Sequence, residues 1–165
     1  MSKIYIIKTG LTDYIEGNLN FITIGSSMFF QCSNITSFSS NLSSLTIGNQ
    51  MFDQCINLTS FNSDLSSLTI GYNMFNRCSN LTSFNSNLSS LTNGSSMFGG
   101  ATYNCTKLDL PSVQNIAETI NDLASKGQTG KINIGISQSI QGNADLEAAL
   151  ETIRSKGWTV SEIYA

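Results

Sequence analysis

Hydrophobic residues recur along the middle of the chain with a fixed period of 23 residues. Three nearly identical blocks follow one another: IGSSMFFQCSNITSFSSNLSSLT at 24–46, IGNQMFDQCINLTSFNSDLSSLT at 47–69 and IGYNMFNRCSNLTSFNSNLSSLT at 70–92. Such a period is typical of solenoids, in which each unit is too small to bury its own apolar residues and depends on stacked neighbours. The pattern therefore predicts a stack of coils, with one coil per block.

The apolar columns predict which positions face the core. Ile24, Ile47 and Ile70 head the blocks, and we assign this column to the core as well. Ser, Thr and Asn fill most positions between the columns, where they suit corners and outward strand positions and can hydrogen-bond the local backbone. In the first block the other apolar columns are Met28, Phe29, Ile35, Phe38, Leu42 and Leu45.

Each coil is predicted to contain three short elements. In the second block we expect a strand at Leu58 to Phe61, a second extended segment at Leu65 to Thr69, and a helical or 3₁₀ turn at Asn49 to Cys55. Pairing between strands of neighbouring coils spaces them by about 4.8 Å. The glycine that recurs in each block, Gly48 in this one, indicates a corner where the backbone needs conformational freedom.

The two ends of the repeat region are less regular. Residues 1–23 are predicted to be a degenerate repeat that acts as an N-terminal cap, since Asn18 to Thr23 matches the end of a block and Ile15 falls at the Phe38 column. A fourth copy begins at Asn93 and is interrupted after Phe98 by the segment Gly99 to Asn104. We expect a last repeat-like strand at 108–110, so the solenoid is predicted to span residues 24–110.

From Pro111 the pattern changes to an alternation of helix and strand, and residues 111–165 are predicted to form a C-terminal cap of two helix–strand units. Such a cap covers apolar columns and strand edges that otherwise promote aggregation. The expected elements are a helix carrying Ile116, Ile120 and Leu123 that ends at Ser125-Lys126-Gly127, a strand at Lys131 to Ile136, a helix from about Asp145 with Asn143 as N-cap, and a strand at Trp158 to Tyr164.

Charge separates the middle of the chain from its ends. Only 12% of the residues are charged, against about 25% in typical globular domains. The charged residues of the stretch 24–100 are Asp53, Asp64 and Arg77. With a net charge of −3 and one basic residue in the repeats, the chain lacks the basic patch that nucleic acids require. No apolar run approaches the roughly 18 residues of a membrane span, and no export signal is recognisable.

Three of the four cysteines share one column, so Cys32, Cys55 and Cys78 are expected in a row along the stack. Adjacent coils lie close enough for a disulfide, but three stacked cysteines cannot pair without leaving one over, and Cys105 is displaced. We therefore predict small, buried, free thiols. The chain has no His and no closely spaced Cys pair, so neither a metal site nor a cofactor is implied.

Two polar columns are also explained by the repeat. Asn34, Asn57 and Asn80 precede the first strand of each block and are expected to hydrogen-bond buried turn backbone rather than a ligand. The Thr-Ser pairs at 36–37, 59–60 and 82–83 are interpreted as ordinary solvated strand. An ice-binding surface is the alternative, but it requires outward Thr-x-Thr spacing.

The residue types in these columns, IGxxMFxxCxNLTSF, closely resemble bacterial leucine-rich repeat proteins of the BspA-like type, whose units carry IGxxAFxxCxxL. The resemblance covers residues 24–98 and has Met28 and its equivalents where that family usually has Ala. It implies a right-handed leucine-rich repeat stack. The expected fold class is therefore an α/β solenoid with short strands, helical or 3₁₀ turns and a C-terminal strand–helix cap. The family's usual proline after the first strand is missing from all three copies.

Nothing in the sequence predicts catalysis. There is no His base and no Gly-rich phosphate loop, and the acidic residues Glu118, Asp122, Glu147 and Glu151 are expected on solvent faces of the cap. The chain is predicted not to be an enzyme, and no catalytic residue is assigned.

Variation among the copies is concentrated at turn positions, which packing does not hold constant. These positions are either merely exposed or form a binding face, on which Phe30 and Tyr72 would supply most of the contact energy. With one residue of the interrupting segment, the candidate binding surface consists of Phe30, Gln31, Asp53, Gln54, Tyr72, Asn73, Asn76, Arg77 and Tyr103.

Two classes of function fit these features. The resemblance implies surface-exposed, adhesin-like recognition modules that bind host proteins or other cells, so the expected partner is a protein or glycan on a cell surface. The alternative is a structural or receptor-binding component of a phage particle or another assembly, which the absence of an export signal favours. Neither class implies membrane insertion, and an oligomer is not indicated.

Overall fold

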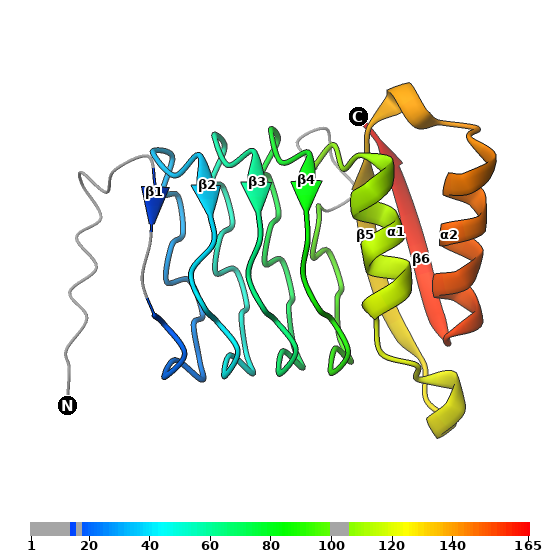
Figure 1. Cartoon of the computed structure of the whole chain (residues 1–165), viewed down its shortest axis with the longest axis horizontal. Helices are drawn as coiled ribbons and strands as arrows, with labels where there is room; N and C mark the ends of the chain where they lie inside the picture. The colour runs from blue at the N-terminus through cyan, green and yellow to red at the C-terminus, as the bar shows by residue number, and fades with distance from the viewer. Residues whose placement is uncertain (1–13, 16–17, 100–105) are drawn as a thin grey trace.

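The computed structural model describes residues 14–15, 18–99 and 106–165, and shows coils stacked side by side with two helices and two longer strands at the C-terminal end (Figure 1). One short strand from each coil forms a parallel sheet in the order β1-β2-β3-β4. Paired residues are 23 positions apart, and Ile15 pairs with Phe38 as the predicted register requires. The strands are β1 (Tyr14–Ile15), β2 (Ser37–Phe38), β3 (Ser60–Phe61) and β4 (Ser83–Phe84).

The opposite side of each coil is a run of interlocked turns, so the predicted helical or 3₁₀ turn at Asn49 to Cys55 is wrong. The N–H of Met51 donates to a carbonyl three residues earlier, whereas the N–H groups of Gln50 and Gln54 donate to the next coil at 2.9 Å. Gln50 and Gln54 also have φ values of 55° and 64°, which a right-handed helix cannot contain. The N–H groups of Gln50, Phe52 and Gln54 therefore hold neighbouring coils together.

The predicted second extended segment at Leu65 to Thr69 is wrong as well. The N–H of Leu68 donates to the carbonyl of Leu65 at 2.9 Å, and Asp64 Oδ1 accepts the N–H of Ser66 at 2.8 Å. This side-chain acceptor favours a turn over an extended backbone. Pairing with the neighbouring coil resumes at Thr69, whose N–H donates to Thr46 O at 2.9 Å, and continues at Ile70, which forms a bridge with Ile47.

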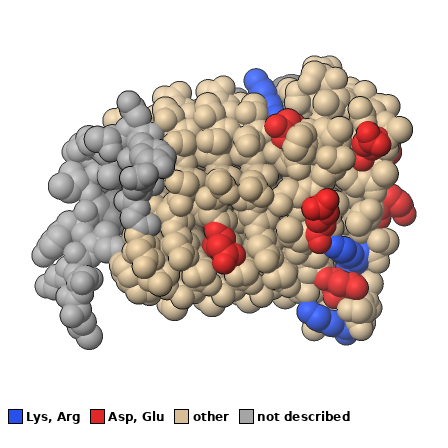
Figure 2. All heavy atoms as spheres, in the orientation of Figure 1, with Lys and Arg blue, Asp and Glu red and all other residues tan. Residues whose placement is uncertain are grey.

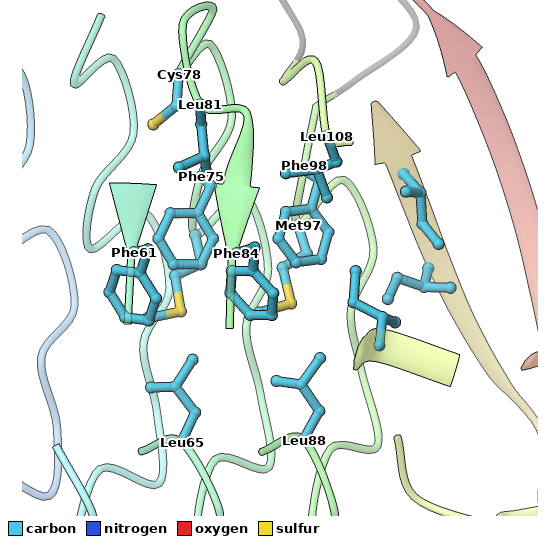
Figure 3. Close-up of a cluster of buried hydrophobic side chains, with 14 of the residues drawn as sticks. Phe61, Leu65, Phe75, Cys78, Leu81, Phe84, Leu88, Met97, Phe98 and Leu108 are labelled. Atoms are coloured by element: carbon cyan, nitrogen blue, oxygen red, sulfur yellow. The ribbon is translucent and has the colours of Figure 1, made fainter. Parts of the chain in front are cut away.

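Two interdigitated columns of phenylalanine rings run through the core of the stack (Figure 3). One column contains Phe38, Phe61 and Phe84, and the other contains Phe29 and its equivalents on the turn side. Within a column, ring centroids are 5.1–5.7 Å apart and the rings are stacked. Between columns the rings meet edge to face at 4.7–5.7 Å, a geometry that aromatic pairs prefer. The predicted columns that begin with Phe29, Ile35, Phe38, Leu42 and Leu45 are buried, and the Met28 column is buried except at Met28, which is partly buried.

The column that heads the blocks is not part of this core. Ile24 is 62% exposed, and Ile47 and Ile70 are half-buried. The next residue in each block faces inward instead, since a Cβ on Gly48 would lie 3.1 Å from Met74 Sδ. Successive residues of an extended segment point to opposite sides. Gly48 is therefore closely packed against side chains of the core, and its φ is not positive, so the conformational freedom that we expected does not explain it.

The C-terminal region consists of α1 (Leu110–Thr119), η1 (Ala124–Lys126), β5 (Gly130–Ile136), η2 (Gln138–Ile140), α2 (Ala144–Ser155) and β6 (Trp158–Tyr164). The predicted strands at 131–136 and 158–164 are confirmed, and they pair in parallel. The second helix is also confirmed, with Asn143 Oδ1 accepting the N–H of Asp145 at 2.8 Å as its N-cap.

Two boundaries near α1 differ from the prediction. The expected strand at 108–110 is limited to a bridge at Leu108, because Asp109 is the N-cap of α1 and accepts the N–H of Ser112 at 3.0 Å. The helix ends at Thr119 and does not reach Leu123. Asn121 is buried and donates its side-chain N–H to Leu91 O at 3.0 Å. The backbone N–H of Asn121 donates to Leu88 O at 3.1 Å instead of to a carbonyl of the helix, so the helical hydrogen-bond pattern does not continue.

The first helix and strand of this region each continue one side of the stack. Ser112 of α1 accepts the N–H of Phe84 at 2.8 Å, so α1 lies beside β4. On the turn side, the N–H of Gly94 donates to Lys131 O of β5 at 3.0 Å. The α2 helix and β6 form a further layer outside α1 and β5 (Figure 1). The apolar end of the repeats is covered in this way.

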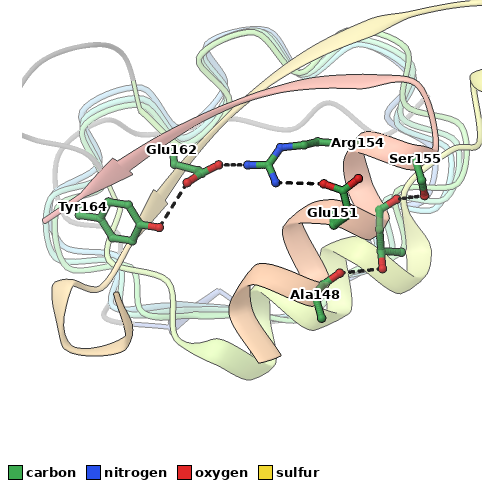
Figure 4. A network of polar contacts seen from close by, with 7 residues as sticks. Ala148, Glu151, Arg154, Ser155, Glu162 and Tyr164 are labelled. Atoms are coloured by element: carbon green, nitrogen blue, oxygen red, sulfur yellow. Dashed lines mark hydrogen bonds and ion pairs between the residues drawn. The ribbon is translucent and has the colours of Figure 1, made fainter. Parts of the chain in front are cut away.

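Charged side chains tie the outermost layer together (Figure 4). Arg154 of α2 forms ion pairs with Glu151 of the same helix and with Glu162 of β6. Tyr164 donates its hydroxyl to Glu162 at 3.3 Å, and burial together with this carboxylate raises the pKa of Tyr164. Charges on an edge strand discourage pairing with other chains. In Figure 2 charged side chains gather over this region, while the visible face of the coils is nearly free of them.

Candidate functional site

Eight of the nine candidate residues lie on the turn side, within consecutive coils; the ninth, Tyr103, lies outside the described residues. Seven of them occupy three columns of the repeat. Tyr72 belongs to a fourth column, whose other members are Ser or Asn. The structure therefore brings these residues to one side of the solenoid. Their exposure is not uniform, and this determines what each of them can contact.

The prediction that Asp53 belongs to the binding surface is wrong, because its side chain is buried and cannot contact a partner. Its Oδ1 accepts the side-chain N–H of Asn76 at 3.0 Å. Burial raises the pKa of Asp53 above its ordinary value of 3.8, although the Asn76 hydrogen bond and the charge of Arg77 oppose the shift. The Asp53 carboxylate therefore links two coils, but burial removes water from around its charge.

The replacement Asp53→Asn is expected to stabilise the protein at neutral pH. The folded pKa is raised, so the folded state binds protons more readily than the unfolded state, and the carboxyl group destabilises the fold as the pH rises through its folded pKa. Asn keeps the acceptor for Asn76 without the charge. The urea concentration at the midpoint of unfolding should be higher for Asp53→Asn than for the wild type at neutral pH, and this difference should shrink as the pH falls toward 3.8. An advantage that is unchanged at low pH would contradict this explanation.

The backbone restricts two of the turn columns, which have positive φ values. Gln31, Gln54 and Arg77 form one of them and have φ values of 59°, 64° and 59°, in the left-handed region. β-Branched residues are strongly disfavoured in this conformation, so these positions vary only among unbranched side chains. Gln31 Nε2 donates to Gln54 Oε1 at 3.2 Å, and the Arg77 side chain extends the column at the surface.

Exposed apolar side chains make the same side suitable for binding. Tyr72 is 46% exposed and Ile24 is 62% exposed. Ile70 and Tyr72 flank the inward-facing Gly71 and therefore point to the same side. We call Ile24, Ile47, Ile70 and Tyr72 the corner ridge. Contiguous apolar groups with polar surroundings mark interaction surfaces.

The isoleucines of the corner ridge were missed at the sequence level, because a constant apolar column was interpreted as core. One signal could have revealed them. Asn93 replaces isoleucine in the fourth copy, and an isolated amide does not fit a dry core column. Asn93 is exposed in the structure.

The cysteine row is buried, and Cys32, Cys55 and Cys78 are free thiols. Cys55 Sγ donates to Phe29 O and Cys78 Sγ to Phe52 O, each at 3.0 Å. Burial raises the pKa of Cys55 to about 12 and that of Cys78 well above its ordinary value. These thiols link neighbouring coils and are held in the unreactive, protonated form.

In the native protein at about pH 8, Cys55 is expected to react with a thiol reagent roughly a thousandfold more slowly than a free cysteine, because only the thiolate is nucleophilic. All 4 cysteines should react after unfolding without reductant. Absorbance from Ellman's reagent measures both states. Fast labelling of Cys55 in the native protein, or half or fewer of the cysteines reacting after unfolding, would overturn the assignment.

The asparagine and threonine side chains hydrogen-bond the backbone of the preceding coil, as predicted for the asparagines, but the asparagine bonds lie among exposed residues and not in the buried position that we expected. Asn57 Nδ2 donates to Ser33 O at 2.7 Å, and Asn80 Nδ2 donates to Ile56 O at 2.8 Å. Thr59 Oγ1 donates to Thr36 O at 2.9 Å. These groups stabilise contacts between coils.

The described ranges show no metal-binding cluster of three or more His, Cys, Asp or Glu residues. Within the same ranges, none of the helices has the length and apolar character needed to cross a bilayer. Glu118, Asp122, Glu147 and Glu151 are exposed, in agreement with the sequence-based expectation.

A family model described as the BspA type leucine rich repeat region, with six copies, matches residues 8–126. The match includes the three intact blocks, the interrupted fourth copy and α1. Comparisons with curated proteins and with solved structures gave no match.

Proposed function

The chain belongs to the BspA-type leucine-rich repeat family, and from this premise we propose that it is a non-enzymatic, adhesin-like recognition module that binds a protein on a cell surface. The observation that carries the proposal is the corner ridge, a line of Ile side chains that is exposed at Ile24 and half-buried at Ile47 and Ile70, with the exposed Tyr72 beside it. The proposed contact surface consists of this ridge together with Gln31, Gln54 and Arg77.

The chemistry of this surface supports protein binding. Tyr and Arg are the residue types that dominate binding energy in protein interfaces, and Tyr72 and Arg77 lie on the same turn segment. Neutral Ser, Asn and Gln side chains surround them and can form the polar rim of an interface. The surface has little charge, so electrostatic steering contributes little to its specificity.

The scaffold also supports this role. Each turn segment is hydrogen-bonded to the next one through alternate N–H groups, and the ring columns beneath are closely stacked. A rigid surface loses little conformational entropy on binding. The variable residues are therefore held in a fixed arrangement before a partner arrives.

The proposal is tested with the triple variant Ile70→Asn, Tyr72→Ser and Arg77→Gln. Each new residue already occupies the same column in another copy, at Asn93, Ser26 and Gln54, so the fold is expected to persist. Partners captured from bacterial and host surface extracts are identified by mass spectrometry, and their affinity for both chains is measured by surface plasmon resonance. We expect the variant to bind at least about thirtyfold more weakly.

The matched control is Asp64→Asn, which changes the strand side and should leave the affinity for the protein partner unchanged. Equal binding by the wild type and the triple variant would contradict the proposal. It would also fail if the chain bound no surface protein and instead co-purified with virions in stoichiometric amount.

A further inference from the structure

A polar cleft opens on the strand side, where the coils of β3 and β4 meet α1. It is shallow, with a volume of about 410 Å³. Its walls include Asn62, Asp64, Asn85, Asn87, Asn115 and Thr119. The corner ridge lies on the turn side, so the cleft is a separate surface.

The amide groups of the cleft are held in fixed orientations. Asn115 Nδ2 donates to Asn85 Oδ1, and Asn85 Nδ2 donates to Asn62 Oδ1, both at 3.2 Å. Asn115 Oδ1 accepts the N–H of Ser86 at 3.0 Å. In this series of hydrogen bonds each amide donates to the next one, from Asn115 to Asn85 to Asn62, and Asn62 is the last acceptor. The Nδ2 group of Asn62 is therefore a preorganised donor of two hydrogen bonds.

A second pair of groups places an acceptor beside a donor. Asp64 Oδ1 accepts the N–H of Ser66 at 2.8 Å, and Asn87 Oδ1 accepts the N–H of Ser89 at 2.9 Å. Within the described ranges, Asp64 Oδ2 and Asn87 Nδ2 have no hydrogen-bond partner in the protein. Because Asp64 and Asn87 are equivalent residues of adjacent coils, they are separated by about one strand spacing, 4.8 Å.

We propose that this cleft binds a neutral carbohydrate. A sugar hydroxyl both donates and accepts hydrogen bonds, so two hydroxyls on adjacent ring carbons can donate to Asp64 Oδ2 and accept from Asn87 Nδ2 together. The Asn62 donor extends the site by another hydroxyl. Because the site is shallow and lined by polar groups, we expect dissociation constants in the millimolar range.

The same groups disfavour other ligands. The lining contains no Lys or Arg, and the negative charge of Asp64 repels carboxylate and sulfate groups. Acidic sugars are therefore excluded. An extended peptide fits less well, since its carbonyls on one side recur about every 6.7 Å and do not match the spacing of the coils.

The test uses the full chain labelled with ¹⁵N and titrated with maltotriose, cellotriose, mannotriose and trigalacturonic acid. At least one neutral trisaccharide is expected to shift the side-chain amide signals of Asn62 and Asn87. The acidic trisaccharide should cause no such shifts. Asp64→Asn retains the Oδ1 acceptor and replaces the free acceptor by a donor, so it should raise the dissociation constant about tenfold.

Asn41→Ala is the matched control, because Asn41 Oδ1 accepts the N–H of Ser43 at 2.9 Å in the same column, but Asn41 lies in the neighbouring coil and does not line the cleft. This variant should bind like the wild type. The inference is overturned if none of the neutral trisaccharides shifts these signals, if the acidic one binds equally well, or if Asp64→Asn retains full affinity. The triple variant of the corner ridge should keep its sugar affinity, so the two proposals fail independently.

Discussion

Replacing Phe61 by alanine is expected to lower the free energy of unfolding by about 3–5 kcal/mol. Phe61 is 1% exposed and stacks between Phe38 and Phe84 at centroid distances of 5.6 and 5.7 Å. It also meets Phe52 and Phe75 edge to face at 5.4 and 4.8 Å. The substitution removes one ring from the Phe38 column, together with its edge-to-face contacts to the other column, and leaves a cavity that the rigid stack cannot close.

Urea unfolding followed by circular dichroism measures this effect, and Phe21→Ala serves as the control. Phe21 is 55% exposed, so its replacement should change the free energy by less than about 1 kcal/mol. Similar losses for the two variants would show that the phenylalanine columns do not form the core as described.

The second large effect is expected from Gly135→Ala, which should destabilise the protein by at least about 2 kcal/mol. A Cβ on Gly135 would lie 2.4 Å from Thr106 O and 2.8 Å from Phe98 O, both of them backbone atoms. The Gly135 carbonyl also accepts the N–H of Leu108 at 3.0 Å. Relief of the contact requires β5 to move away from the fourth coil.

Unfolding in urea and the fluorescence of the dye ANS are the two measurements for this variant, because a displaced β5 exposes the apolar end of the repeats. Gly142→Ala is the control. Gly142 has a φ of 78° and a Cβ there would meet no atom within 4 Å. The Gly142→Ala substitution should lower the free energy of unfolding by about 1 kcal/mol through backbone conformation alone, and this variant should bind no additional dye. Dye binding by Gly142→Ala and none by Gly135→Ala would contradict the packing of β5 on the repeats.

The period and the core columns were predictable because they depend on spacing alone. A residue that recurs every 23 positions must occupy the same place in each coil, and large constant side chains such as Phe61 have to be buried somewhere. The cap helix α2 and the strands β5 and β6 were predictable for a similar reason, since their caps and apolar periodicity are local signals.

The turn segments were not predictable from these signals. Alternate N–H groups of the segment at 49–55 donate to the next coil, and sequence spacing does not distinguish this arrangement from a helical turn. The end of α1 was missed because Asn121 is tied to Leu91, a contact between distant parts of the chain.

The candidate surface was predicted only in part. The turn columns were identified by their variation, and Tyr72 is exposed as expected. Asp53 was misplaced because it varies among the copies and is nevertheless buried against Asn76. The isoleucines of the corner ridge were assigned to the core, since constancy among copies does not separate an inner from an outer column.

Hydrogen–deuterium exchange of the complex with a captured partner tests the central claim, recognition through the turn side, most directly. The N–H groups of Gly48, Gln50, Gly71 and Asn73 are bonded to the next coil and should already exchange slowly. Added protection is therefore expected at the exposed ends of these segments, around Tyr72 and Arg77. The strand-side residues Asn62 and Asn85 should be unaffected. Protection confined to the strand side or to α2 and β6 would contradict the account.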